Sequence, residues 1–358
     1  MKFVHIADLH LDSPFTNLSE KGNLGNIRRL EQRNAIKKVI SYCKENDVNY
    51  LFIAGDLYEE NYIRKTSIDY INSLFKEIPN TKIFISPGNH DPYVKNSIYS
   101  KYNFNENVYI FRESKVEKYE DENANIYGSA FTDFYEQESS IDNLENLEMN
   151  GKPNILVMHC DLNGAKDKEG FSYNAVLESK LKDLGFDYCA LGHIHKSNFE
   201  VGKRIIYPGS LISLGFDELG EHGMIVGEIN NGELTTKFIP VDERMFNEIE
   251  VDITNFNTQE ELVEYIDALE LKEKVMYKVV LVGNRNFEIN SYEILKLINQ
   301  ENILKIKDKT KLGYNIEKLS QENSLKGIYI RKILEKAESG EFSQEEIEKA
   351  IELGLEVM

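Results

Sequence analysis

Two histidines separated by one residue, His193 and His195, follow a glycine and an apolar run near the middle of the chain. Such a pair can direct two imidazoles to one point, and neutral histidine is the commonest metal-binding side chain. Other polar residues also come directly after short apolar runs. They are Asp8 and His10 after 3–7, Asp56 after 51–55, Asn89, His90 and Asp91 after 83–88, and His159 after 155–158. The sequence therefore predicts a metal site where the ends of several strands converge.

The chemistry of such a site is recognisable from its donors. Two divalent ions held a few Å apart can clamp a phosphoester and activate a water molecule, provided that a carboxylate bridges them. The Asp, Asn and His residues that follow the apolar runs offer the required mixture of oxygen and nitrogen ligands. Each short motif is weak evidence by itself. Their order, each after a predicted strand, is specific.

The elements that position these residues alternate in type. We expect strands at 2–7, 49–54 and 82–86, separated by helices at 27–45 and 66–77 whose apolar residues recur every three or four positions. This order indicates an α/β sheet flanked by helices. Further strands are expected at 108–111, 125–128, 154–158 and 187–191, a helix at 173–183, and antiparallel strands at 204–207, 223–229 and 233–239. We interpret these later strands as a second sheet packed on the first.

The length of 358 residues exceeds what one hydrophobic core usually fills. Pro240 is a plausible boundary, because the chain after it alternates between strands and helices again. We expect a domain at 1–240, a small α+β capping or DNA-binding domain at 241–315, and a helical tail at 316–358 that is a candidate partner-binding segment. Ser343 and Glu346 form the pattern of a capping box at the start of the last helix.

Composition limits the class of protein. The net charge of −19 argues against a generic binder of polyanions, although a local basic groove is compatible with it. The three cysteines are too few for a disulfide framework, which favours a reduced, cytoplasmic setting. We find no signal peptide and no apolar run approaching the roughly 20 residues needed to cross a membrane.

The ordered motifs resemble those of the calcineurin-like metallophosphoesterases over about residues 1–240, which implies a two-sheet β-sandwich flanked by helices. The resemblance implies that Asp8, His10 and His195 hold one metal ion and that Asn89, His159 and His193 hold the other, with Asp56 bridging. In this family the counterpart of His90 acts on the substrate phosphate, and Asp91 would orient His90. The ligand set suits manganese, iron or zinc, and we favour two manganese ions.

A narrower resemblance is carried by four longer segments, 6–11, 54–58, 190–196 and 207–210. They are similar to DNA repair exonucleases of the SbcD and YhaO type. That resemblance implies manganese, DNA ends or single strands as substrate, a coiled-coil ATPase partner of the SbcC/YhaN type, and a possible homodimer. Archaeal and eukaryotic relatives carry a histidine three residues after the bridging aspartate, where this chain has Glu59. The role of that histidine cannot be transferred.

Our hypothesis is a two-metal phosphodiesterase that acts as a DNA exonuclease or endonuclease in DNA repair. One alternative is a metallophosphoesterase for a small nucleotide or a phosphoprotein; another is a non-catalytic subunit that binds DNA ends. The second domain argues against the first alternative, and the complete ligand set argues against the second.

Four lysines at steps of two, Lys305, Lys307, Lys309 and Lys311, would share one face of a strand. They could bind DNA phosphates, or they could protect an exposed edge strand from aggregation. Among the remaining residues, we expect His5 in the core or behind a ligand, and His222 on the surface. Cys160 and Cys189 should be buried apolar residues.

Overall fold

The structure is a computed structural model that describes residues 1–15, 23–135, 138–164, 173–285, 287–313, 316–338, 340 and 342–357. The chain forms two compact units, Met1–Phe246 and Asn247–Met358. The division falls shortly after Pro240, where the sequence predicts a boundary. Each unit is described by itself.

The first unit contains a six-stranded sheet in the order β13-β12-β1-β2-β3-β4. Strands β1 to β4 are parallel, and β12 runs antiparallel to β1. The strands are β1 (Lys2–Ile6), β2 (Tyr50–Ile53), β3 (Lys82–Ile85), β4 (Val108–Ile110), β12 (Gly223–Asn230) and β13 (Glu233–Pro240). The strands β1 to β3 are almost entirely buried, as expected for parallel strands covered on both faces.

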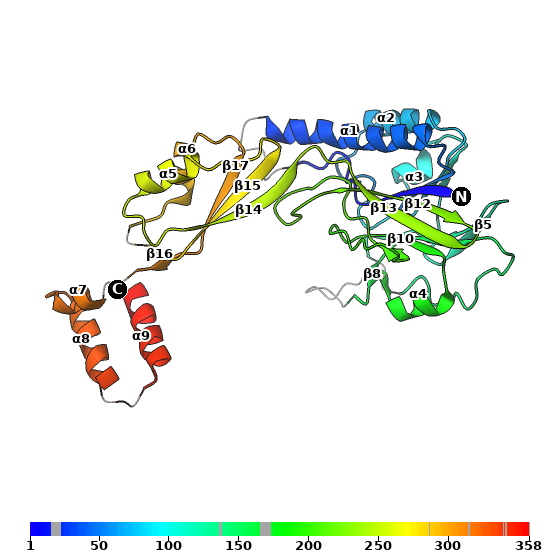
Figure 1. The fold of residues 1–358 in the computed structure, drawn as a ribbon. Coiled ribbons are helices and arrows are strands. Elements are labelled where there is room, and N and C mark those ends of the chain that lie inside the picture. The colour runs from blue at the N-terminus through cyan, green and yellow to red at the C-terminus, as the bar shows by residue number, and fades with distance from the viewer. Residues whose placement is uncertain are drawn as a thin grey trace. The chain divides into compact units, whose positions relative to one another are not determined.

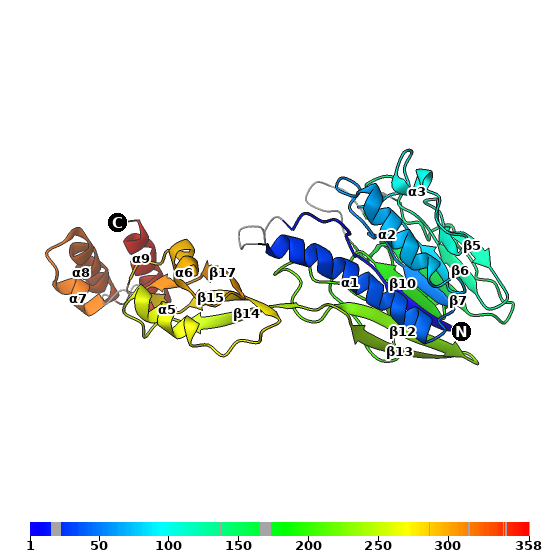
Figure 2. The same cartoon turned by 90° about the horizontal axis from the view of Figure 1, so that it is seen from above.

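Helices α1 (Leu24–Glu45) and α2 (Lys65–Lys76) cover the outer face of this sheet (Figures 1 and 2). Their buried residues recur at the three- and four-residue steps that the sequence predicts. In α1 these include Ile36, Val39 and Ile40, and in α2 they include Ile68 and Ile71. The observed helices differ from the predicted ones by only a few residues at their ends.

A second, five-stranded sheet has the order β11-β10-β7-β6-β5. Its members are β5 (Glu117–Glu120), β6 (Asn125–Gly128), β7 (Asn154–His159), β10 (Tyr188–Gly192) and β11 (Ile205–Ile206). Helix α4 (Glu178–Leu184) packs on its outer face (Figure 1), where Leu181 joins a buried cluster with Leu156 and Leu191. The short elements α3 (Ile98–Lys101), β8 (Asp161–Leu162) and β9 (Ala175–Val176) complete this unit.

The main core lies between the two sheets. Phe3 and Phe52 of the first sheet meet Tyr188 of the second, and the ring centroids of Phe3 and Tyr188 are 4.5 Å apart. The two-sheet sandwich with outer helices is the α/β fold that the sequence predicts. Several assignments were wrong. Strands β4, β12 and β13 belong to the first sheet rather than the second, and β11 pairs with β10 in parallel rather than antiparallel. The helix expected at 173–183 begins only at Glu178, because β9 occupies Ala175–Val176.

Because β1, β2 and β3 are parallel, their carboxyl ends lie at one edge of the first sheet. In the second sheet β7 and β10 are also parallel, and they end side by side at His159 and Gly192. The two edges are joined directly, since the His159 N–H donates to Oγ of Ser86, which follows β3. The loops that carry the predicted ligands therefore leave the sandwich together.

The second unit begins with a three-stranded sheet in the order β14-β15-β17, formed by β14 (Met245–Asp252), β15 (Val275–Val282) and β17 (Ile303–Asp308). Helices α5 (Gln259–Asp267) and α6 (Ser291–Leu297) alternate with these strands. The Thr258 hydroxyl caps α5 and the Asn290 amide oxygen caps α6. This alternation is the α+β arrangement that the sequence predicts.

The four lysines do not share one strand. Strand β17 ends at Asp308, whose Oδ1 accepts hydrogen bonds from N and Oγ1 of Thr310 and so fixes a turn. Lys311 belongs to β18 (Lys311–Leu312), which pairs with β16 (Asn284–Arg285) in a separate sheet. Only Lys305 and Lys307 share a face of β17, an edge strand of the described sheet.

The remaining helices, α7 (Ile316–Gln321), α8 (Leu325–Glu338) and α9 (Gln344–Glu356), follow these strands. Ile330 of α8 packs with Ile351 and Leu355 of α9 in a small buried cluster. The capping box of Ser343 and Glu346 is present, as predicted. None of the described helices combines the length and apolar character needed to cross a membrane.

Candidate metal centre

The candidate site is built by residues at the ends of five strands or in the loops that follow them. The Asp8 N–H donates to the Gly55 carbonyl at 3.1 Å, and the His10 N–H donates to the Asp56 carbonyl at 2.9 Å, which holds the loops after β1 and β2 together. Asp8, His10 and Asp56 all have positive φ angles near 50°. Few residues other than glycine adopt that conformation, although Asp and His do so more often than most, and such positions cluster at functional sites.

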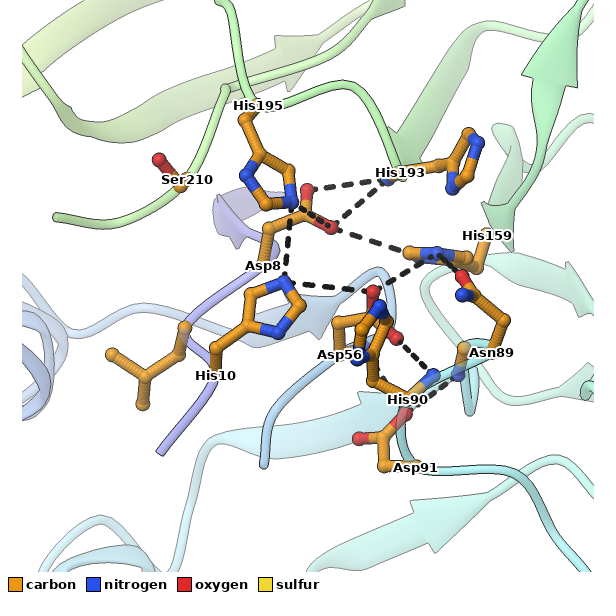
Figure 3. Close-up of polar contacts among 12 residues, drawn as sticks. Asp8, His10, Asp56, Asn89, His90, Asp91, His159, His193, His195 and Ser210 are labelled. Carbon is orange, nitrogen blue, oxygen red and sulfur yellow. Dashed lines mark hydrogen bonds and ion pairs between the residues drawn. The ribbon is translucent and has the colours of Figure 1, made fainter. Parts of the chain in front are cut away.

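The side chains form three overlapping groups of three residues. Within each group, the potential ligand atoms lie within 4.8 Å of one another. The groups are Asp8, His10 and His195; Asp8, Asp56 and His159; and His10, Asp56 and His90. The first group is the ligand set predicted for one ion. The second contains the predicted bridging carboxylate and a predicted ligand of the other ion. Figure 3 shows these side chains turned toward a common centre.

Three of the imidazoles share one arrangement, in which Nδ1 faces an acceptor and Nε2 faces the centre. Nδ1 of His10 lies 2.7 Å from Oε1 of Glu59, Nδ1 of His195 lies 2.6 Å from Oε1 of Glu218, and Nδ1 of His159 lies 2.9 Å from the Ala54 carbonyl. An acceptor at Nδ1 fixes the proton there and leaves the Nε2 lone pair for a metal ion. Nε2 of His10 and Nε2 of His195 are only 3.1 Å apart, as for two ligands of one ion.

Asp56 occupies the middle of the site. Its Oδ2 lies 3.6 Å from Nε2 of His10 and 3.4 Å from Nε2 of His159, while its Oδ1 accepts the His90 N–H at 2.9 Å. Burial by itself would raise the pKa of Asp56, but the imidazoles of His159 and His10 hold that pKa below its ordinary value. A carboxylate that stays ionised between two groups of imidazoles suits a bridging ligand.

Asn89 and His193, the other two predicted ligands, differ in position from the three anchored imidazoles. Oδ1 of Asn89 lies 3.0 Å from Nε2 of His159, the other side chain predicted to bind the same ion. His193 donates its backbone N–H to both oxygens of Asp8, and its ring stacks on Tyr173 with centroids 5.2 Å apart. Among the described residues, no group of three close ligand atoms includes the His193 ring. Its role as a ligand stays a prediction.

His90 is the most open imidazole of the site, with its side chain about 45% exposed. Its Nδ1 lies 3.1 Å from Oε2 of Glu59. Partial burial lowers the pKa of His90, but the hydrogen bond to Glu59 and the charge of Asp56 outweigh it and raise the pKa to about 9. An exposed imidazole that holds its proton can donate to a phosphate or to a departing oxygen.

Asp91 does not have the predicted position beside His90. The buried Asp91 carboxylate accepts the N–H groups of Gly88 and Leu57 at 2.7 Å and the hydroxyl of Tyr99 at 2.7 Å. It therefore connects the loops after β2 and β3, and Glu59 is the carboxylate that contacts the His90 ring. The sequence could not distinguish these partners, because Asp91 is adjacent to His90 and Glu59 is distant along the chain.

Glu218 is a site residue that no sequence motif indicates. Besides His195, this carboxylate accepts the hydroxyl of Ser210 at 2.7 Å and the N–H of Leu214 at 3.0 Å. His222, expected on the surface, is buried because its ring bonds to Ser210 and to the Glu218 carbonyl. A network of this kind depends on how the loop after β11 folds back, so spacing along the chain does not reveal it.

His5, Cys160 and Cys189 are buried, as predicted. Nδ1 of His5 lies 2.9 Å from the Tyr188 hydroxyl, and its Nε2 lies 3.2 Å from the Leu191 carbonyl. Burial lowers the pKa of His5 to about 3. This histidine therefore belongs to the core behind the site.

Two glycines of the motifs are explained by close contacts. A Cβ at Gly55, whose φ is +87°, would lie 2.2 Å from Nδ1 of His159. A Cβ at Gly192 would lie 1.7 Å from the Ala54 carbonyl oxygen. Larger residues at either position would displace the loops that carry the ligands. The Gly-Asp and Gly-His pairs are thus packing requirements of the site.

The donor set fits divalent ions. It combines carboxylate, amide and imidazole ligands without thiolate. Nε2 of His10 and of His159 faces Asp56, and Nε2 of His195 faces Asp8. Burial raises the pKa of Asp8, and a nearby cation would oppose that shift and favour the ionised carboxylate. The fold and the site thus define a phosphoester hydrolase with a metal centre at the strand ends.

Comparison with known proteins agrees. The family model described as calcineurin-like phosphoesterase matches residues 1–197, so the chain belongs to that family and is a metal-dependent hydrolase. It is 26% identical over 281 residues to a protein of Bacillus subtilis (strain 168) named uncharacterized metallophosphoesterase YhaO, covering 75% of this chain and 67% of that protein. It is 28% identical over 292 residues to the SbcD component of the nuclease SbcCD of Staphylococcus epidermidis, covering 70% of this chain and 72% of that protein.

Proposed function

We propose that this protein is a manganese-dependent nuclease that hydrolyses phosphodiester bonds of DNA. The observation that carries the proposal is the set of three imidazoles with anchored Nδ1 atoms and Nε2 atoms directed at Asp8 and Asp56. The similarity to a nuclease component supports a diester rather than a monoester substrate. The presence of a second folded unit supports a substrate larger than a nucleotide, because an enzyme for a small substrate does not need one.

Divalent ions bound at this centre would polarise the phosphoester and activate a water molecule. Asp8, His10 and His195 would hold one ion, and Asn89, His159 and His193 the other, with Asp56 between them. His90, exposed and protonated, would donate a hydrogen bond to the phosphate and then a proton to the departing oxygen. Glu59 would orient the rings of both His10 and His90.

We also propose a role in DNA repair with a coiled-coil ATPase. The similarity to a protein named as one component of a nuclease supports the existence of a partner. Helix α8 supports the location of the contact, because Leu325 is 70% exposed and Ile328 is 47% exposed. These residues are one helical turn apart and therefore lie on one face.

The test is a comparison of four substrates after removal of metal with EDTA and addition of manganese, magnesium or zinc. The substrates are linear duplex DNA, circular single-stranded DNA, a bis-aryl phosphate and a mono-aryl phosphate, with Asp56→Asn as the inactive control. We expect DNA and the bis-aryl phosphate to be cleaved with manganese. Hydrolysis of aryl phosphates alone would contradict the nuclease and favour a small substrate. Circular DNA distinguishes endonuclease from exonuclease action.

A further inference from the structure

A pocket of about 610 Å³ in the first unit lies between the N-terminal half of α1 and the first turn of α2. Its lining includes three arginines, Arg29, Arg33 and Arg64, together with Asp12 and Tyr62. This concentration of cations is unexpected in a chain whose net charge is −19. The pocket contains none of the metal-ligand candidates.

Only one of the three arginines is neutralised by the pocket's own carboxylate. Nη2 of Arg33 donates to Oδ1 of Asp12 at 2.7 Å and to Oγ of Ser67 at 2.9 Å, which ties α1 to α2. Arg29 donates to the Pro14 carbonyl at 3.1 Å, which is uncharged. Among the described residues, no carboxylate forms an ion pair with Arg29 or Arg64.

The two helices add to the positive potential. The first turns of α1 and α2 contain no acidic residue. Arg64 is the N-cap of α2, and its own side chain does not cap the helix. Its backbone N–H donates to Oδ2 of Asp12 at 3.3 Å, which also accepts the Ser67 hydroxyl, so Asp12 occupies part of this helix end. The first N–H groups of a helix and the positive end of its dipole favour anions. Arg64 and Thr66 of this end both line the pocket.

The pocket is adjacent to the metal centre along the chain. Asp12 follows His10 by two residues, and two residues of chain span at most about 7 Å. The phosphates of one strand of a DNA duplex advance by about 3.4 Å of helix axis each and are further apart in an extended single strand, so this span corresponds to about one phosphate. On the other side, the Tyr62 N–H donates to the carbonyl of Glu59, whose side chain contacts His10 and His90.

We propose that this pocket binds the backbone phosphates next to the scissile one in a single strand of nucleic acid. Arg29 and Arg64 contact these phosphates, and Tyr62, 55% exposed, provides a surface on which an unpaired base stacks. The inference rests on the proposed nuclease function and adds to it a subsite for an extended strand. A small phosphodiester reaches the metal centre without reaching the pocket.

The test uses the full chain with Arg29→Gln and Arg64→Gln combined. Arg33 is left in place because it joins α1 to α2. The matched control is Lys44→Gln with Lys76→Gln, which removes the same charge from exposed positions in the last turns of the same two helices. Both proteins are compared with the wild type in kcat/KM for a single-stranded oligonucleotide and for a bis-aryl phosphate.

We expect the arginine variant to lose about tenfold or more in kcat/KM on the oligonucleotide. Its log–log salt slope should flatten by about 0.7 for each lost phosphate contact. Hydrolysis of the bis-aryl phosphate should be unchanged, and the lysine control should resemble the wild type on both substrates. Equal losses in the arginine and lysine variants, or no loss in either, would overturn the inference.

A second variant tests the stacking surface. Tyr62→Ala should raise the KM for the oligonucleotide by about tenfold, whereas Tyr62→Phe should leave it unchanged because the ring is retained. An oligonucleotide with abasic sites should make the wild type and Tyr62→Ala alike. A wild-type enzyme that cleaves the bis-aryl phosphate but no oligonucleotide would instead remove the nuclease function, and the inference with it.

Discussion

Oε1 of Glu218 lies 2.6 Å from Nδ1 of His195, whose Nε2 faces His10 across the centre of the site. Burial by itself would lower the pKa of His195, but the contact with Glu218 raises it to about 9. The carboxylate thus makes the imidazole more basic and fixes its orientation. Oε1 of Glu59 likewise lies 2.7 Å from Nδ1 of His10, so each of the two rings contacts a glutamate on the side away from the centre.

We predict that Glu218→Gln and Glu59→Gln each weaken manganese binding by about 10- to 100-fold, the usual effect of removing the group behind a metal-bound histidine. Manganese affinity is measured by titration calorimetry, which is independent of turnover. Glu221→Gln, an exposed neighbour, serves as the control for Glu218. Unchanged affinity in both variants would mean that these carboxylates have no influence on the centre.

His90 and His193 should behave in opposite ways. We predict that His90→Ala lowers kcat by about 10²- to 10⁴-fold without loss of metal, because this ring acts on the phosphate. His193→Ala should lose metal and activity together. Metal content is measured by mass spectrometry after exchange into manganese buffer.

His90 lies close enough to His10 and Asp56 to contribute a ligand atom, so the experiment decides between two interpretations of the geometry. If His90→Ala releases an ion, His90 is a ligand and not the proton donor. If His193→Ala retains both ions, the His193 ring is not a metal ligand, in agreement with its stacked position on Tyr173.

His5 should make stability depend on pH. Its pKa is lowered to about 3 in the folded protein, compared with 6.5 in the unfolded chain, because burial opposes the charge. Between these values the unfolded chain binds a proton that the folded chain does not, so stability falls as pH is lowered. His5→Gln should remove up to about 1.4 kcal/mol of this fall per pH unit.

The measurement is urea unfolding of the metal-free protein at several pH values between about 3.5 and 7, chosen around those two pKa values. EDTA is present throughout, so that protonation of the ligands affects both proteins alike. The relevant quantity is the difference in slope between wild type and variant, since other groups contribute equally. Parallel curves would show that the pKa of His5 is the same in the folded and the unfolded protein.

The sequence was sufficient for those parts of the site that depend on strand order. Parallel pairing brings the ends of β1 and β2, and with them Asp8 and Asp56, to one edge of the first sheet, and it aligns His159 with Gly192 at the edge of the second. The packing of the two sheets then brings these edges together. What the sequence could not supply are contacts between loops. Glu59 and Glu218 reach the histidines only after their loops fold back, and an isolated glutamate in a loop has no pattern that marks it.

Sheet membership shows the same limit. Strands β12 and β13 pair as an antiparallel hairpin, yet they extend the sheet of β1 instead of the sheet of β10, which precedes them along the chain. Alternation fixes which face of a strand is buried, but it does not choose between two sheets with similar edges. In the second unit, the Asp308–Thr310 turn interrupts a lysine pattern that is continuous in the sequence.

The exposed residues of α8 should mediate binding to a coiled-coil ATPase. We predict that Leu325→Glu with Ile328→Glu lowers co-purification with such an ATPase by at least about tenfold, because buried apolar area would be lost at the contact. Hydrolysis of a bis-aryl phosphate should be unaffected. Val201→Glu, which is 88% exposed in the other unit, is the control. Undiminished co-purification would exclude this face as the contact.

Lys305 and Lys307 offer a test of DNA binding by the second unit. Both are exposed on edge strand β17, where lysines either contact phosphates or prevent strands of two molecules from pairing. If they contact phosphates, changing both to Gln should flatten the log–log salt slope of duplex binding by up to about 1.8. Lys272→Gln with Lys274→Gln, two exposed lysines at the same spacing in the loop before β15, is the control.

Fluorescence anisotropy gives the slope, and light scattering gives the tendency to aggregate. A slope equal to that of the control, together with increased scattering, would assign these lysines to protection of the edge strand and exclude DNA binding by them.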